Sequence, residues 1–210
     1  MKKTFIILFL IIFCSFKMTG QDIKKDTINQ FDSLGLKTGL WITYSSSTEQ
    51  TRSVLYYVRG KKNGLCKFYT DNGILQNEIE YKNDLIDGLF KHYTIYGKYE
   101  ISEYKNNIQE GVSKFYNYKG ILIESSEYKN NILNGKKLQY SLKTGRVIME
   151  SNFINGKENG TRRSFSDNEK KEIIVEADFA EDIRVERRFY KRGKLIKVIK
   201  DEIGTQAILK

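Results

Sequence analysis

Apolar and polar positions repeat along this chain with a period of 23 to 25 residues. Each unit opens with a glycine, and the residue five positions later is always aromatic. The opening glycines and these aromatic residues are Gly39, Gly64, Gly88, Gly111, Gly135 and Gly160, and Tyr44, Tyr69, Tyr93, Tyr116, Tyr140 and Phe165. A late aromatic column closes the units with Tyr57, Tyr81, Tyr104, Tyr128, Phe153 and Phe179. The runs between them are rich in Tyr, Phe, Ile, Leu and Val, which favours β-strands.

Two turn signals recur in each unit. Three residues after the late aromatic stand Gly60, Asp84, Asn107, Asn131 and Gly156. Glycine, asparagine and aspartate tolerate positive φ, so this position predicts a tight turn. A second signal falls in the middle of the units at Gly73, Gly97, Gly120 and Gly145. Two extended runs and two turns predict one β-hairpin for each repeat.

A single unit is too small to fold alone. It offers about four buriable side chains, for example Leu65, Tyr69, Leu75 and Tyr81, which contribute roughly 6–12 kcal/mol. Ordering about two dozen residues costs about 1–2 kcal/mol each. The hairpins must therefore stack. We expect an all-β, elongated, single-layer antiparallel hairpin array of five to six repeats. Its core should be a ladder in which Leu75, Leu122 and Val147 lie among the tyrosines.

The unit resembles the MORN repeat, and more closely the bacterial variant G-x-x-x-x-Y…G…Y-x-N-G-x-x-x-G of the YwqK-like antitoxin family. The resemblance covers Gly39 to Phe179. Two features depart from it: Trp41 is the one tryptophan, and the N-G turn has become Asn83-Asp84, Asn106-Asn107 and Asn130-Asn131. The resemblance implies a bacterial protein with a single-layer antiparallel β-repeat that serves in binding. It does not imply an enzyme.

The N-terminus predicts export. Residues 1–20 are typical of a signal peptide, with Lys2 and Lys3 followed by an apolar run that is too short to span a membrane. We expect a periplasmic, envelope-associated or extracellular protein. An uncleaved anchor or a buried strand is the alternative interpretation. A lipoprotein anchored at Cys14 would need a small residue before the cysteine, where Phe13 stands.

The repeats have flanks of different composition. Residues 21–38 are polar and predict a flexible lead-in or an irregular cap. The repeat domain covers 39–179, and its pattern decays after Gly160. Residues 180–210 predict a C-terminal capping hairpin that turns at Lys191-Arg192-Gly193. Its many charges would protect an exposed sheet edge.

Candidate chemistry is sparse. His92 is the single histidine, and Cys66 is the only cysteine after the leader, so no cysteine–histidine metal site can form. Cys66 replaces the aromatic residue of other units and is expected to fill the core. Nucleotide and hydrolase motifs are absent. Glu80, Glu103 and Glu127 each precede a late aromatic, which indicates a structural role. We expect no catalysis, metal or cofactor.

Charge gives the remaining functional signal. The formal net charge is +10, or +7 without Lys2, Lys3 and Lys17. The candidate ligand-binding residues form two columns of a stacked sheet, namely Lys67, Lys91 and Lys114, and Tyr69, Tyr93 and Tyr116. Such a surface suits a protein partner or an anionic envelope component such as a glycan or lipid headgroup, with peripheral membrane contact as an option. Export argues against nucleic acid. Charges that merely keep both faces solvated are the simpler interpretation.

These features predict a non-enzymatic exported scaffold that binds a protein or an envelope component. The first alternative is an antitoxin or immunity protein that neutralises a toxin by direct binding. The second is an envelope hydrolase built on the repeats.

Overall fold

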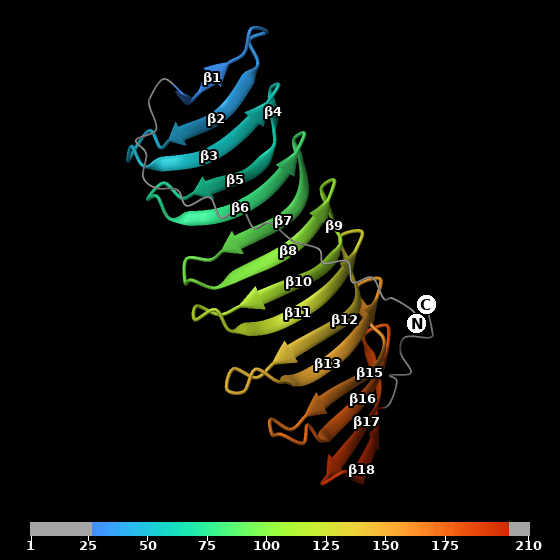
Figure 1. The fold of residues 1–210 in the computed structure, drawn as a ribbon. Coiled ribbons are helices and arrows are strands. Elements are labelled where there is room, and N and C mark those ends of the chain that lie inside the picture. Colours follow the sequence, from blue (N-terminus) through green and yellow to red (C-terminus); the bar gives the residue numbers. More distant parts are fainter. Residues whose placement is uncertain (1–26, 202–210) are drawn as a thin grey trace, which may run out of the picture.

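A computed structural model describes residues 27–201 and shows one open antiparallel sheet of 18 strands (Figure 1). The strands are β1 (Gln30–Phe31), β2 (Lys37–Tyr44), β3 (Thr51–Val58), β4 (Lys61–Lys62), β5 (Gly64–Tyr69), β6 (Leu75–Lys82), β7 (Leu85–Tyr93), β8 (Tyr99–Lys105), β9 (Ile108–Gln109), β10 (Gly111–Tyr116), β11 (Leu122–Lys129), β12 (Ile132–Tyr140), β13 (Val147–Ile154), β14 (Lys157–Glu158), β15 (Gly160–Phe165), β16 (Ile173–Ala180), β17 (Ile183–Lys191) and β18 (Lys194–Lys200). The predicted all-β hairpin array is confirmed. The expected signal peptide at 1–20, with Cys14, lies outside the described residues.

The strands pair in chain order and stack along one long axis (Figure 1). β4 and β5 both pair with β3, β9 and β10 both pair with β8, and β14 and β15 both pair with β13. Each of these couples is therefore one interrupted strand path. The tight turns lie along one long side of the sheet and the mid-unit turns along the other (Figure 1). The described residues contain no helix long and apolar enough to cross a membrane.

The predicted turn residues adopt positive φ as their chemistry requires. In the tight turn at Asn130-Asn131 the φ angles are 52° and 65°. The asparagine side chain also links the repeats, because Asn131 Oδ1 accepts a hydrogen bond from Gln109 N of the preceding unit at 2.7 Å. Asn107 and Asp182 bond in the same way to Ile86 N and Glu158 N. The departure from the N-G turn therefore adds a bond between successive repeats.

The two faces of the sheet follow from the strand register, since paired residues point to the same side. We call groove face the side of Leu55, Cys66, Ile79, Phe90, Ser102, Ser113, Ser126 and Ser151. The late aromatic column lies on this side as well. We call ladder face the side of Lys67, Glu78, Lys91, Lys114 and the early tyrosines.

The buried apolar core lies near the N-terminal end of the groove face. Leu55, Tyr57 and Cys66 form it, with Trp41, Phe68 and Tyr81 packed against them. Cys66 is 0% exposed, which confirms its predicted core-filling role, and burial raises the pKa of its thiol.

The predicted ladder of tyrosine and aliphatic residues exists, but it lies on the ladder face, on the opposite side of the sheet from the buried apolar core. Leu75, Leu122 and Val147 pair with the early tyrosines of the ladder face. Those side chains stay partly exposed, because the described residues form a single sheet and no second layer covers this face.

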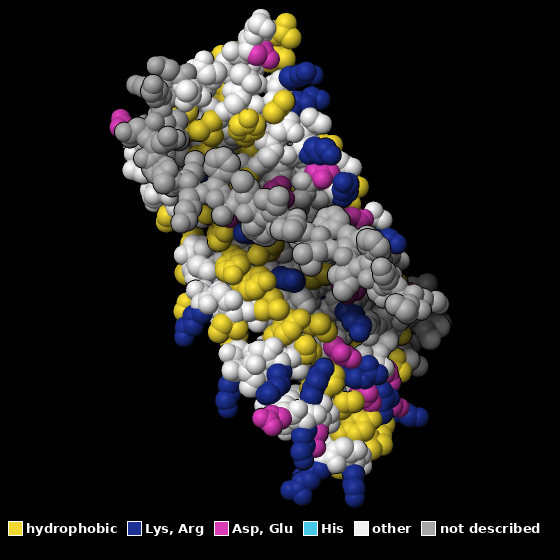
Figure 2. Space-filling view, viewed as in Figure 1, with side chains coloured by type: hydrophobic (Ala, Val, Ile, Leu, Met, Phe, Trp, Pro, Cys, Tyr) yellow, Lys and Arg dark blue, Asp and Glu magenta, His cyan; other side chains and the backbone are white. Residues whose placement is uncertain are grey.

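Both flanks join the same sheet. Part of the predicted lead-in forms β1, which pairs with β2, so the described residues from 27 to 38 make an irregular cap. The predicted final hairpin is present as β17 and β18, with the turn at Arg192-Gly193. Lysine and arginine side chains gather over this end of the molecule (Figure 2).

Candidate functional site

The predicted lysine and tyrosine columns do share one face, but acidic residues neutralise part of them. Lys67 Nζ lies 3.0 Å from Glu78 Oε1, and Lys91 Nζ lies 3.9 Å from Glu78 Oε2. Tyr93 Oη donates to Glu78 Oε2 at 2.8 Å. Burial and this hydrogen bond raise the pKa of Tyr93 to about 12. Burial opposes ionisation of Glu78, but the bonds from Lys67 and Tyr93 outweigh it and lower the pKa of that carboxyl.

Lys114 differs from the other two lysines. Its cross-strand neighbours are Ile101 and Ser125, and within residues 27–201 it forms no ion pair. Tyr116 stacks on Tyr99 with ring centroids 4.7 Å apart. Of the predicted basic column, Lys114 is therefore the member whose charge is free for a ligand.

Two of the glutamates that precede the late aromatics, Glu80 and Glu127, hold the backbone, as their position indicated. Glu80 Oε2 accepts from Leu89 N at 2.9 Å, and Glu127 Oε2 accepts from Lys136 N at 2.9 Å. A Cβ on Gly88 would lie 2.1 Å from Glu80 Oε2. The repeat glycine is thus required where the carboxylate crosses to the next strand.

The groove face carries three hollows of similar construction in successive units. The first, of ≈ 440 Å³, includes Phe68, Asn77 and Tyr81 among its lining residues. The second, of ≈ 280 Å³, is lined by Phe90, His92, Glu100, Ser102, Tyr104 and Gln109. The third, of ≈ 220 Å³, is lined by Glu100, Ser113, Phe115, Glu124, Ser126 and Tyr128. Each combines a late tyrosine, a phenylalanine and polar side chains. The second and third share Glu100, and we call the row of three hollows the groove.

Glu100 lies where the second and third hollows meet, because it lines both. Its Oε1 accepts hydrogen bonds from the hydroxyls of Ser102, at 3.1 Å, and Ser113. These serines are only 5% and 6% exposed. The serines fix the carboxylate in the floor of the groove, which positions it to meet a bound molecule.

The next carboxylate along the groove is neutralised. Glu124 Oε1 lies 2.9 Å from Lys137 Nζ. Burial raises the pKa of Tyr104 and of Tyr128, and the charge of Glu100 raises both further. The negative charge of Glu100 therefore acts in both hollows.

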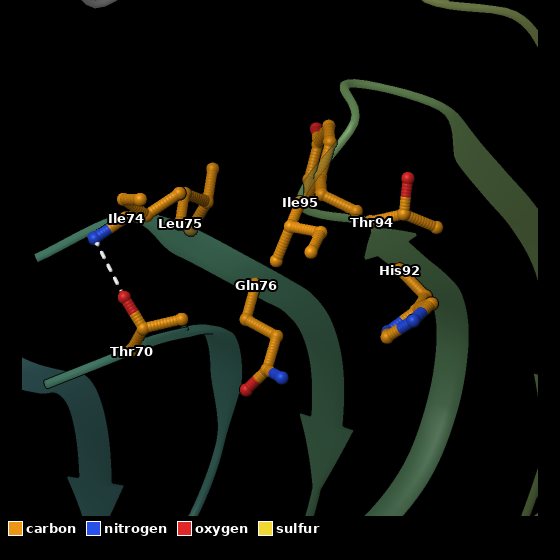
Figure 3. Close-up of a pocket in the computed structure, with 8 residues that line it drawn as sticks. Thr70, Ile74, Leu75, Gln76, His92, Thr94 and Ile95 are labelled. Carbon is orange, nitrogen blue, oxygen red and sulfur yellow. Dashed lines mark hydrogen bonds between the residues drawn. The ribbon is translucent and has the colours of Figure 1, made fainter. Parts of the chain in front are cut away.

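A further hollow of ≈ 180 Å³ opens between two mid-unit turns (Figure 3). Gln76 of β6 and His92 of β7 are among the residues that line it, and Ile74 N donates to Thr70 Oγ1 at 3.1 Å. His92 is exposed, and its Nδ1 donates to Asn77 Oδ1 at 2.8 Å. Among the described residues, the hydrogen-bond partner of His92 is thus Asn77, and not one of the threonine and tyrosine hydroxyls that also line this hollow.

Sequence reasoning missed Glu100, Glu124 and the serine row. A signal was present, because the residue two positions before each late aromatic is small or apolar. This column is Leu55, Ile79, Ser102, Ser126, Ser151 and Ala177, and all six are buried. Serines in a column that is otherwise apolar mark where the interior becomes polar.

Among residues 27–201, no three His, Cys, Asp or Glu side chains are grouped to hold a metal ion. No protein-family model matches this chain, and no curated protein matches it either. The functional proposal therefore depends on the groove and the ladder face.

Proposed function

We propose that this protein is a non-enzymatic exported scaffold that binds an extended segment of another protein along its groove face. The observation that supports this most strongly is the repetition of one hollow in three successive units. A series of shallow, aromatic-lined hollows suits a linear ligand with regularly spaced side chains, rather than one compact substrate. Export remains our proposal from the leader sequence.

The predicted lysine and tyrosine surface is the competing binding face. Glu78 neutralises Lys67 and Lys91, which weakens the attraction of this face for an anionic envelope component. Lys114 keeps its charge. Adjacent residues of β10 serve to compare the faces, since Ser113 lies in the groove and Lys114 on the ladder face.

A selection from a random peptide library tests the proposal. The full chain should enrich a set of peptides, and Ser113→Trp, which fills the third hollow, should lose them. Lys114→Trp is the matched control and should retain them. Phe115→Ala, which removes a ring from the same hollow without adding volume, should also weaken binding. If only Lys114→Trp loses the peptides, the ladder face is the binding face and the proposal is wrong. If the full chain enriches no peptides at all, the proposal is also refuted.

The resemblance to MORN repeats of the YwqK-like antitoxins leads to a second proposal. A toxin would be the bound protein if this resemblance reflects kinship. The long groove supports it only in so far as it can cover an extended surface of a partner. Deleting the gene while leaving its neighbours intact should then poison the cell or its siblings, and normal growth in contact with kin would dispose of the idea.

A further inference from the structure

Glu100 is an unusual carboxylate of the groove face. Glu124 and Glu158, which lie on the same face, each pair with a lysine or an arginine. Glu100 is half-buried and forms no ion pair within the described residues. Its Oε1 holds both serine hydroxyls, while no hydrogen bond within 27–201 uses its Oε2. One carboxylate oxygen thus remains available to a ligand.

The surroundings of this oxygen favour a cation. Phe90 and Tyr104 line the hollow on one side, and Phe115 and Tyr128 line the hollow on the other. Aromatic faces attract ammonium and guanidinium groups, and a carboxylate gives such a group a charge-assisted hydrogen bond. Lys137, a basic residue of the groove row, is engaged by Glu124.

The spacing of the hollows selects a chain conformation. Successive hollows lie two strands apart, which is about 9.4–9.8 Å at the usual strand separation. A polyproline II helix repeats every three residues over about 9.3 Å, so every third side chain points to the same side. In a β-strand the third residue would point to the opposite side. A polyproline II segment therefore matches the groove and a β-strand does not.

We propose that the groove binds a polyproline II segment of a partner protein and that Glu100 receives a lysine or arginine side chain of that segment. This inference rests on the proposed function and adds the ligand's conformation and charge. Every third residue of the segment enters a hollow, and the basic residue enters at the junction of the second and third hollows.

Synthetic peptides test the inference directly. The probe is a proline-rich peptide with arginine at every third position, titrated against the full chain by fluorescence anisotropy. The comparison peptide carries glutamate in place of arginine. The chain's net charge of +10 favours the glutamate peptide without any specific site, so preference for arginine cannot come from bulk charge.

The variants separate the carboxylate from the rest of the strand. Glu100→Gln keeps the shape and the acceptor for the serines, and should weaken binding of the arginine peptide about tenfold or more. Glu103→Gln is the control, because Glu103 is an exposed residue of β8 on the ladder face. It should leave the affinity unchanged. Replacing the prolines by glycine should weaken binding as well, since the conformation must then be ordered on binding.

The possible failures are distinguishable. Equal affinity for both peptides, no binding of either, or an unchanged affinity of Glu100→Gln overturns the cationic inference. If the library selection still yields peptides that the Ser113→Trp variant no longer binds, the proposed function holds even though the cationic inference is overturned. If that selection yields none, the proposed function falls as well.

Discussion

In the first hairpins the central row of the groove face consists of the apolar residues Leu55, Cys66 and Ile79. In the last hairpins the same row carries Ser151, Arg162 and Ala177. Strand pairing and the positive φ angles of the tight turns are alike at both ends. The backbone of the array is therefore set by glycines, turns and cross-strand bonds. The faces are free to change from apolar to polar along the molecule, and the proposed binding groove occupies the zone where they change.

The C-terminal region replaces apolar packing by ionic contacts. Arg163 lies 3.2 Å from Glu150 and 3.0 Å from Glu176, and Arg188 lies 3.3 Å from Glu176 and 2.5 Å from Asp178. These residues alternate in charge across neighbouring strands of the ladder face. Such partly exposed pairs contribute less than apolar burial and depend on pH and salt. The two regions should therefore unfold under different conditions.

The largest expected effect comes from breaking the apolar end. Leu55→Ala should lower the free energy of unfolding by about 2–4 kcal/mol, because it leaves a cavity beside Cys66 and Tyr57. Ser151→Ala, at the equivalent position of the polar end, should cost less than about 1 kcal/mol. Denaturant unfolding of the full chain measures both. Equal losses would show that the two ends are held by the same kind of packing.

Low pH should destabilise the C-terminal region. The hydrogen bond from Arg188 lowers the pKa of Asp178 against the opposing effect of burial, and the hydrogen bond from Arg184 lowers the pKa of Asp201. A folded-state pKa below the unfolded value of about 4 gives stability that is present above that pH. This stability is lost as the pH falls through the folded pKa values.

Hydrogen exchange should therefore show β16 to β18 losing protection below about pH 4, before the strands around Leu55. Glu78 also has a lowered pKa, so the N-terminal end should weaken somewhat, but its apolar core does not titrate in this range. Simultaneous loss of protection along the whole sheet would contradict the comparison.

The smallest expected effect tests what the two regions share. Asp84→Gly and Asp182→Gly keep a residue that tolerates the φ angles of 69° and 72°, but each removes one bond to the preceding unit. Each should cost about 0.5–1.5 kcal/mol, and the two losses should be alike. Thermal unfolding of the two variants measures this. A large difference would mean that the turns, and not only the faces, differ between the ends.

The sequence by itself determined the fold, the repeat length and the turns, because each depends on local chemistry. Positive φ at Asn131 and the exclusion of a side chain at Gly88 require particular residue types at fixed positions, so a periodic pattern reveals them. The late aromatic column and the final hairpin were predictable for the same reason.

Only the tertiary structure decided which faces the side chains share and which charges remain unpaired. Lys67 and Lys91 look alike in the sequence, yet one glutamate from the strand between them neutralises both. Glu100 and Glu124 also look alike, but Lys137 reaches only the second. Pairing across strands depends on register and side-chain reach between residues far apart in the chain, and a pattern along one chain does not contain that information.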